Sequence, residues 1–150
     1  MKGTTRAALV VVALVISACS GGDKPPVSRK APAGSPEVMR MVTDYARYYG
    51  VPPSLMHRIV RHESSYNPSA KNGPYLGLMQ IAPQTARIMG HDGPATGLLD
   101  PETNLRYGGK YLRGAWLVSH GDEERAIQWY RKGYYYEAKR MGLLEEAGLR

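Results

Sequence analysis

A glutamate at the end of an amphipathic helix is the residue in this sequence best placed for acid–base chemistry. Residues 53–61 predict a helix, because Pro53 suits a first turn and apolar residues then recur at helical spacing. Glu63 continues that apolar face, and Asn67-Pro68 then turns the chain. Both the helix dipole and partial burial should disfavour the ionised carboxylate. A carboxylic acid of this kind could protonate a glycosidic oxygen.

For an isolated glutamate, the commoner outcome is a solvated side chain at a helix end, paired here with Arg58 or Arg61. The sequence around Glu63 changes this balance. Residues 63–70 read Glu-Ser-x-Tyr-Asn-Pro-x-Ala, and residues 77–86 read Gly-Leu-Met-Gln-Ile-x-Pro-x-Thr-Ala. Residues 100–112 read Asp-Pro-x-x-Asn-Leu-x-x-Gly-x-x-Tyr-Leu. Three ordered blocks of fixed positions form a far more specific pattern than one short motif.

These three blocks closely resemble the signature of the soluble-lytic-transglycosylase (SLT) family, in the goose-lysozyme-like group of peptidoglycan-cleaving enzymes. The resemblance covers about residues 37–141 and implies a mainly α, lysozyme-like single domain. It also implies a lytic transglycosylase, which cleaves the β-1,4 bond between N-acetylmuramic acid and N-acetylglucosamine and leaves 1,6-anhydromuramic acid ends. Glu63 would then be the catalytic residue, first as acid and afterwards as base.

The count of carboxylates bears on the reaction route. A conventional glycosidase uses two carboxylates. In the signature here Glu63 is the one carboxylate outside a helix-cap or surface-like setting, because Asp100 is placed to cap a helix start. That favours a non-hydrolytic route, in which the substrate supplies its own nucleophile. Two other readings stay open: a hydrolytic muramidase on the same scaffold, and a non-catalytic peptidoglycan-binding lipoprotein.

The resemblance also implies substrate-binding roles for five residues around Glu63. They are Ser64, Tyr66, Met79, Gln80 and Tyr130. For Ser64 a helix-end hydrogen bond, for Gln80 a structural hydrogen bond and for Tyr130 core packing are the competing interpretations. Two positions depart from the family pattern. Asn72 stands where the family commonly has serine, and Arg131 stands where it has asparagine.

The bulk composition fits one domain and an anionic partner. The chain has 150 residues, no Phe, 11 Tyr and a formal charge of +7, which becomes +5 once Lys2 and Arg6 of a leader are removed. The basic residues form no long run, so nucleic acid is not indicated, whereas peptidoglycan is a suitable polymer. We expect no cofactor and no metal site, with His57 and His91 as surface residues, because no metal-binding motif is present.

The first 35 residues predict export and anchoring. Residues 1–18 resemble a lipoprotein signal peptide, with a basic start, a short apolar stretch and Ile-Ser-Ala before Cys19. Cys19, the one cysteine, would be lipidated and would anchor the chain to a membrane, the outer membrane by resemblance, on its periplasmic side. An ordinary signal peptide or a short membrane anchor is the alternative. Cell-wall or secretion machinery is a further candidate partner.

Residues 19–35 are rich in Gly, Pro and Ser and predict a flexible tether. Residues 36–150 form the expected folded domain. Helices are predicted over residues 36–49, 53–61, 83–89, 100–119, 122–130 and 134–148, with a loop over 91–97 and a small hairpin near residues 70–80.

Overall fold

The structure is a computed structural model that describes residues 32–149. The predicted signal peptide, the lipidation site Cys19 and most of the tether lie outside the described residues. The predictions for those segments therefore stay predictions. Within the described residues, no helix has the length and apolar character needed to cross a membrane.

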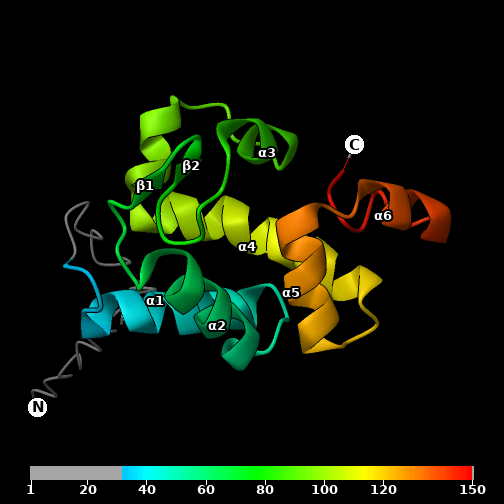
Figure 1. Cartoon of the computed structure of the whole chain (residues 1–150), viewed down its shortest axis with the longest axis horizontal. Helices are drawn as coiled ribbons and strands as arrows, with labels where there is room; N and C mark the ends of the chain where they lie inside the picture. Colours follow the sequence, from blue (N-terminus) through cyan, green and yellow to red (C-terminus); the bar gives the residue numbers. More distant parts are fainter. Residues whose placement is uncertain (1–31, 150) are drawn as a thin grey trace, which may run out of the picture.

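The described chain is mainly helical, as predicted (Figure 1). In chain order its elements are α1 (Pro36–Tyr48), α2 (Pro53–Ser64), β1 (Lys71–Asn72), β2 (Tyr75–Leu76), α3 (Pro83–Ile88), the 3-10 helix η1 (Ala95–Leu99), α4 (Pro101–Val118), α5 (Glu123–Lys132) and α6 (Tyr135–Met141). The two short strands form the expected hairpin, in which Lys71 pairs with Leu76 and Asn72 with Tyr75 in antiparallel register.

Local sequence signals explain where the main helices begin. The side chains of Ser35, Asp100 and Asp122 cap α1, α4 and α5, and each accepts a hydrogen bond from the backbone N–H three residues later. The first turns of α1, α2, α3 and α4 each contain a proline, which loses no helical hydrogen bond at that position.

Helix α4 is the centre of the domain. It runs through the middle of the molecule and packs against α1, α3, α5, α6 and η1 (Figure 1). Two adjacent glycines allow close approach on two sides of this helix. A Cβ on Gly108 would lie 2.8 Å from Met79 Sδ, and one on Gly109 would lie 2.7 Å from the ring of Tyr49. The core therefore depends on α4 having no side chain at either position.

The structure differs from the sequence predictions at helix α6, at residues 95–99 and at His91. Helix α6 ends at Met141 instead of continuing to residue 148, because Gly142 takes a left-handed conformation and ends the helix there. Residues 95–99 form η1, which overlaps the predicted loop. His91 is buried, not at the surface, and its ring packs against Tyr107 while its Nε2 lies 3.2 Å from the Pro94 carbonyl oxygen.

A buried amide on α4 fixes the segment that follows the hairpin. Asn104 is fully buried, and its Nδ2 donates to the carbonyl oxygens of Leu76 and Leu98, both at 2.8 Å. Its Oδ1 accepts a hydrogen bond from the Met79 N–H at 2.8 Å. Gly77 passes so close that a Cβ there would lie 2.3 Å from the Leu98 carbonyl oxygen. This one side chain therefore joins α4, η1 and residues 76–79.

Substituting Asn104 by alanine should strongly destabilise the domain. The change leaves one buried N–H and two buried carbonyl groups without this partner, and each such loss costs about 1–3 kcal/mol. We expect the free energy of unfolding to fall by roughly 3 kcal/mol or more, measured by denaturant unfolding followed by circular dichroism. Asn67→Ala, at an exposed turn, is the control and should cost about 1 kcal/mol or less. Equal losses from both variants would contradict this role for Asn104.

Candidate active site

A cleft of about 200 Å³ opens where the end of α2, the hairpin and the end of α5 meet. Its lining consists of Glu63, Asn72, Tyr75, Gln80, Tyr130 and Arg131. Three residues predicted for the site, Glu63, Gln80 and Tyr130, therefore come together from three separate segments of the chain. In the described part of the chain, Glu63 is the one carboxylate that lines this cleft.

Glu63 sits half-buried at the carboxyl end of α2. The helix buries Leu55, Met56, Ile59 and Val60 on the predicted face. The side chain of Glu63 is 21% exposed. Ser65 and Tyr66 both take left-handed conformations and turn the chain away immediately after the glutamate. The predicted half-buried position beside Gln80 and Tyr130 is confirmed.

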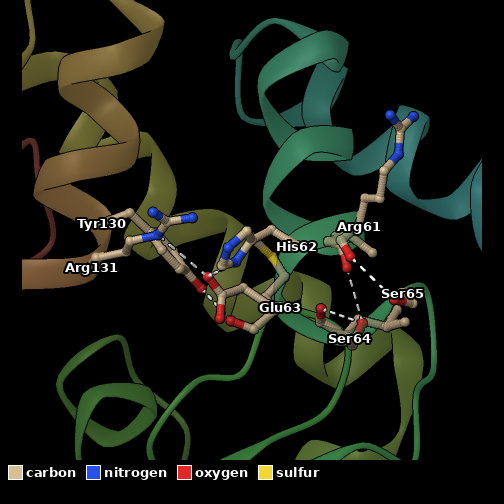
Figure 2. A network of polar contacts seen from close by, with 10 residues as sticks. Arg61, His62, Glu63, Ser64, Ser65, Tyr130 and Arg131 are labelled. Atoms are coloured by element: carbon tan, nitrogen blue, oxygen red, sulfur yellow. Dashed lines mark hydrogen bonds and ion pairs between the residues drawn. The ribbon is translucent and has the colours of Figure 1, made fainter.

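Two basic side chains flank Glu63, and neither is the partner considered from the sequence. His62 Nδ1 lies 3.3 Å from Glu63 Oε1, and Arg131 Nε lies 3.7 Å from the same oxygen. Figure 2 shows Arg131 reaching this oxygen from α5 and His62 from α2. Arg58 instead pairs with Glu123 and Glu124. The Arg131 contact is long and its side chain is 48% exposed, so the pair should be weak and easily exchanged.

Tyr130 is a buried hydrogen-bond donor beside Glu63. Its hydroxyl donates to the Met79 carbonyl oxygen at 2.7 Å. Burial raises the pKa of the Tyr130 hydroxyl well above its usual range, and the nearby Glu63 charge adds to the rise. The hydroxyl therefore stays protonated at neutral pH. It can fix the backbone of Met79 and shape the cleft, but it is poorly suited to accept a proton.

Two other predicted binding residues act mainly on the backbone. The Ser64 hydroxyl lies 2.8 Å from the Leu78 carbonyl oxygen and 3.1 Å from that of Val60, so it ties the end of α2 to the segment after the hairpin. Gln80 lines the cleft, and its Nε2 donates to the carbonyl oxygens of Gly77 at 2.9 Å and Ala70 at 3.2 Å. A direct contact of either residue with substrate stays a prediction.

Met79 and Tyr66 lie outside the lining of the cleft. The Met79 side chain is fully buried, and Gly108 on α4 leaves room for it. Tyr66 is also buried, and its hydroxyl lies 2.9 Å from Nδ1 of His57. The other ring nitrogen of His57 lies 2.8 Å from the Thr43 hydroxyl, so this partly buried histidine links α1 to the turn after α2 instead of lying at the surface.

Sequence reasoning missed Tyr75 as a cleft residue. It sits on β2, is 48% exposed and lines the cleft with Asn72 of β1. The signal that could have found it is the Asn72-Gly73-Pro74 turn, which places the next aromatic residue on the hairpin edge. Asn72 and Arg131, the two departures from the family pattern, both line the cleft. Among residues 32–149, no group of three or more His, Cys, Asp or Glu side chains could hold a metal ion.

Replacing Tyr130 by phenylalanine should destabilise the protein, because the Met79 carbonyl oxygen would lose its buried donor. We expect the free energy of unfolding to fall by about 1–3 kcal/mol in denaturant unfolding. Tyr136→Phe removes a hydroxyl from a ring that is 83% exposed and should change stability by about 0.5 kcal/mol at most. A Tyr130→Phe protein as stable as the Tyr136→Phe control would show that the hydrogen bond to Met79 does not contribute.

Comparison with known proteins identifies the family to which this sequence is similar. The sequence matches the family described as "Transglycosylase SLT domain" over residues 40–141. It is 42% identical over 71 residues to the soluble lytic murein transglycosylase of Escherichia coli (strain K12), an alignment that covers 42% of this chain and 11% of that protein. It is 33% identical over 90 residues to membrane-bound lytic murein transglycosylase C of Mannheimia succiniciproducens, with 55% and 24% covered.

The chain thus spans about a tenth to a quarter of the length of these curated relatives. The family match itself covers more than half of the 150 residues and includes every residue that lines the cleft. A mainly helical domain with Glu63 and Gln80 in one cleft is the arrangement that the resemblance implied. The chain belongs to the transglycosylase SLT domain family, with its lysozyme-like, mainly α fold.

Proposed function

We propose that this protein is a peptidoglycan lytic transglycosylase. It would cleave the β-1,4 bond between N-acetylmuramic acid and N-acetylglucosamine, and its product would end in 1,6-anhydromuramic acid. The observation that carries the proposal is the single half-buried carboxylate, Glu63, in a cleft that the family match covers. The names of the two relatives, both murein transglycosylases, support the same substrate.

In the proposed reaction Glu63 moves one proton in each direction. The protonated carboxyl group gives its proton to the glycosidic oxygen as the bond from that oxygen to C1 of the muramyl sugar breaks. Positive charge then develops at C1. The Glu63 carboxylate takes the proton from the muramyl 6-hydroxyl, and the 6-oxygen bonds to C1 and closes the anhydro ring. No water is consumed, and Glu63 ends the cycle protonated.

The cleft lining favours this route over hydrolysis. An inverting or retaining hydrolase of the two-carboxylate type needs a second acid across the scissile bond, to activate water or to attack the sugar. The other residues that line the cleft are Asn72, Tyr75, Gln80, Tyr130 and Arg131, and none of them carries a carboxylate. A hydrolytic muramidase on this scaffold is therefore the second candidate, and it would need an acid from outside the cleft lining.

The remaining cleft residues have proposed roles in binding. Gln80 would present its side-chain oxygen to a substrate N–H, because its Nε2 is already bonded to backbone oxygens. Tyr75 on the hairpin would offer an exposed ring for stacking against a sugar. Tyr130 and Ser64 would act by holding the backbone of residues 78–79. A binding module without catalysis would use the same cleft but would not need Glu63.

We also propose that the protein works on the periplasmic side of a membrane, anchored by lipid at Cys19. The support is the sequence of residues 1–19 and the fact that the substrate lies in the cell envelope. Residues 20–35 would let the domain reach the wall. Outer-membrane placement and a role beside secretion machinery rest on resemblance alone. Mass measurement of the N-terminal peptide from membranes would detect the acyl chains, and loss of membrane association in Cys19→Ala is expected.

Glu63→Gln should abolish release of soluble fragments from purified peptidoglycan. The amide cannot donate or accept the proton, so we expect the rate to fall by about 100-fold or more. Glu146→Gln makes the same change at an exposed position and should keep full activity. Circular dichroism would verify that both variants fold. A folded Glu63→Gln protein that still cleaves at the normal rate would contradict the proposed role and would favour a different acid.

A further inference from the structure

A second hollow adjoins the candidate active site. It is a groove of about 310 Å³ between α2 and α5, and Arg131 lines both the groove and the cleft that holds Glu63. His62, which also lines the groove, is the chain neighbour of Glu63. A ligand seated in the cleft could therefore extend a substituent past Arg131 and into the groove.

The lining of the groove is amphiphilic and predominantly basic. Ile59 and Ile127 are buried and supply apolar surface. The lining has one acidic residue, Glu124, and four basic residues: Arg58, Arg61, His62 and Arg131. Glu124 is already paired with Arg58 at 2.7 Å. A complementary ligand would be short, would carry small apolar groups, and would end in a carboxylate.

Arg131 is the basic residue best placed to bind such a carboxylate. Its one ion pair within residues 32–149 is the 3.7 Å contact of Nε with Glu63, so both terminal nitrogens remain for a ligand. Arginine binds carboxylates through two parallel N–H donors, and that geometry is stronger than a single long contact. A ligand carboxylate could thus draw Arg131 away from Glu63. The side chain lies at the junction of the two hollows, where Figure 2 shows it directed toward Glu63.

We propose that the groove between α2 and α5 binds the acidic peptide carried by the muramyl sugar, with Arg131 contacting a peptide carboxylate. This inference rests on the proposed function, because peptidoglycan bears short peptides on the lactyl group of its muramyl units. The small apolar side chains of such a peptide would pack against Ile59 and Ile127. Arg131 is then a specificity-determining residue that makes the protein prefer peptide-bearing strands over bare glycan.

The test compares ligands that differ in the carboxylate alone. Calorimetry would measure binding of a disaccharide-peptide with a free terminal carboxylate and of its amidated form. The proteins would be the full chain, Arg131→Gln, and the matched control Arg125→Gln. Arg125 lies on the same helix but lines a different hollow, beside Trp129 and Glu137. The control therefore removes the same charge without touching the groove.

We expect Arg131→Gln to weaken binding of the free-carboxylate ligand roughly tenfold, the loss typical of one charge-assisted hydrogen bond. The amidated ligand should bind the wild-type protein and Arg131→Gln equally, and Arg125→Gln should resemble the wild type. In turnover, Arg131→Gln should raise KM for peptide-bearing strands by a larger factor than KM for peptide-stripped strands. Arg131→Lys keeps the positive charge but lacks the two parallel N–H donors of arginine, so it should bind the free-carboxylate ligand more tightly than Arg131→Gln and less tightly than the wild type.

Two results would overturn the inference. One is equal binding of the free and amidated ligands by the wild-type protein, and the other is an equal loss of affinity in the Arg131 and Arg125 variants. The binding measurement requires no cleavage. If the wild-type protein bound the free-carboxylate ligand through Arg131 but cut no strand, the proposed activity would fail while the peptide site stood.

Discussion

The backbone of residues 76–80 is held by side chains from three helices, and the candidate site depends on that restraint. Ser64 of α2 bonds to the Leu78 carbonyl oxygen, and Tyr130 of α5 bonds to that of Met79. Asn104 of α4 binds the Met79 N–H and the Leu76 carbonyl oxygen. The segment is a turn closed by an antiparallel bridge between Leu76 and Ile81, and the side-chain bonds attach this turn to the three helices. They place Gln80 in the lining of the same cleft as Glu63.

The same restraint explains how the family motifs work together. The glutamate-serine pair supplies both the acid and the bond that ties its helix end to the segment. The Gly-Leu-Met-Gln block supplies backbone groups that other helices hold, while its leucine and methionine are buried. Asn104, in the third block, is a structural residue of the site although it does not line the cleft. The three blocks are distant in sequence but converge on one short piece of backbone.

Much of this arrangement follows from local sequence. The apolar spacing before Glu63, the capping residues and the prolines predict the helices and the half-buried acid. The sequence alone could not predict which side chains pair with each other when distant segments pack together. Arg131 on α5, not Arg58 or Arg61 nearby in the chain, is the arginine that reaches Glu63. Tyr66 belongs to the same block as Glu63, yet it points toward His57, because two left-handed residues turn the chain after the glutamate.

The structure shows where Asn72 and Arg131, the two departures from the family pattern, lie. Both Asn72 and Arg131 are exposed and line the cleft, so these departures affect the surface of the cleft and not the core. Arg131 adds a positive charge beside Glu63, the one acid of the cleft. The same side chain also lines the basic groove between α2 and α5. The cleft thus combines one carboxylate, Glu63, with an arginine that also lines the neighbouring groove. Differences in substrate preference within the family should be sought at such rim positions.

In the proposed reaction one carboxylate suffices, because the 6-hydroxyl of the substrate, and not water, attacks C1. The most direct measurement is mass spectrometry of the fragments that the protein releases from peptidoglycan in water enriched in oxygen-18. We predict fragments that end in an anhydro ring, one water lighter than reducing-end products, with no oxygen-18 incorporated. Reducing ends that each carry one oxygen-18 atom would contradict the proposed reaction, since water would then be the nucleophile and a second acid would have to activate it.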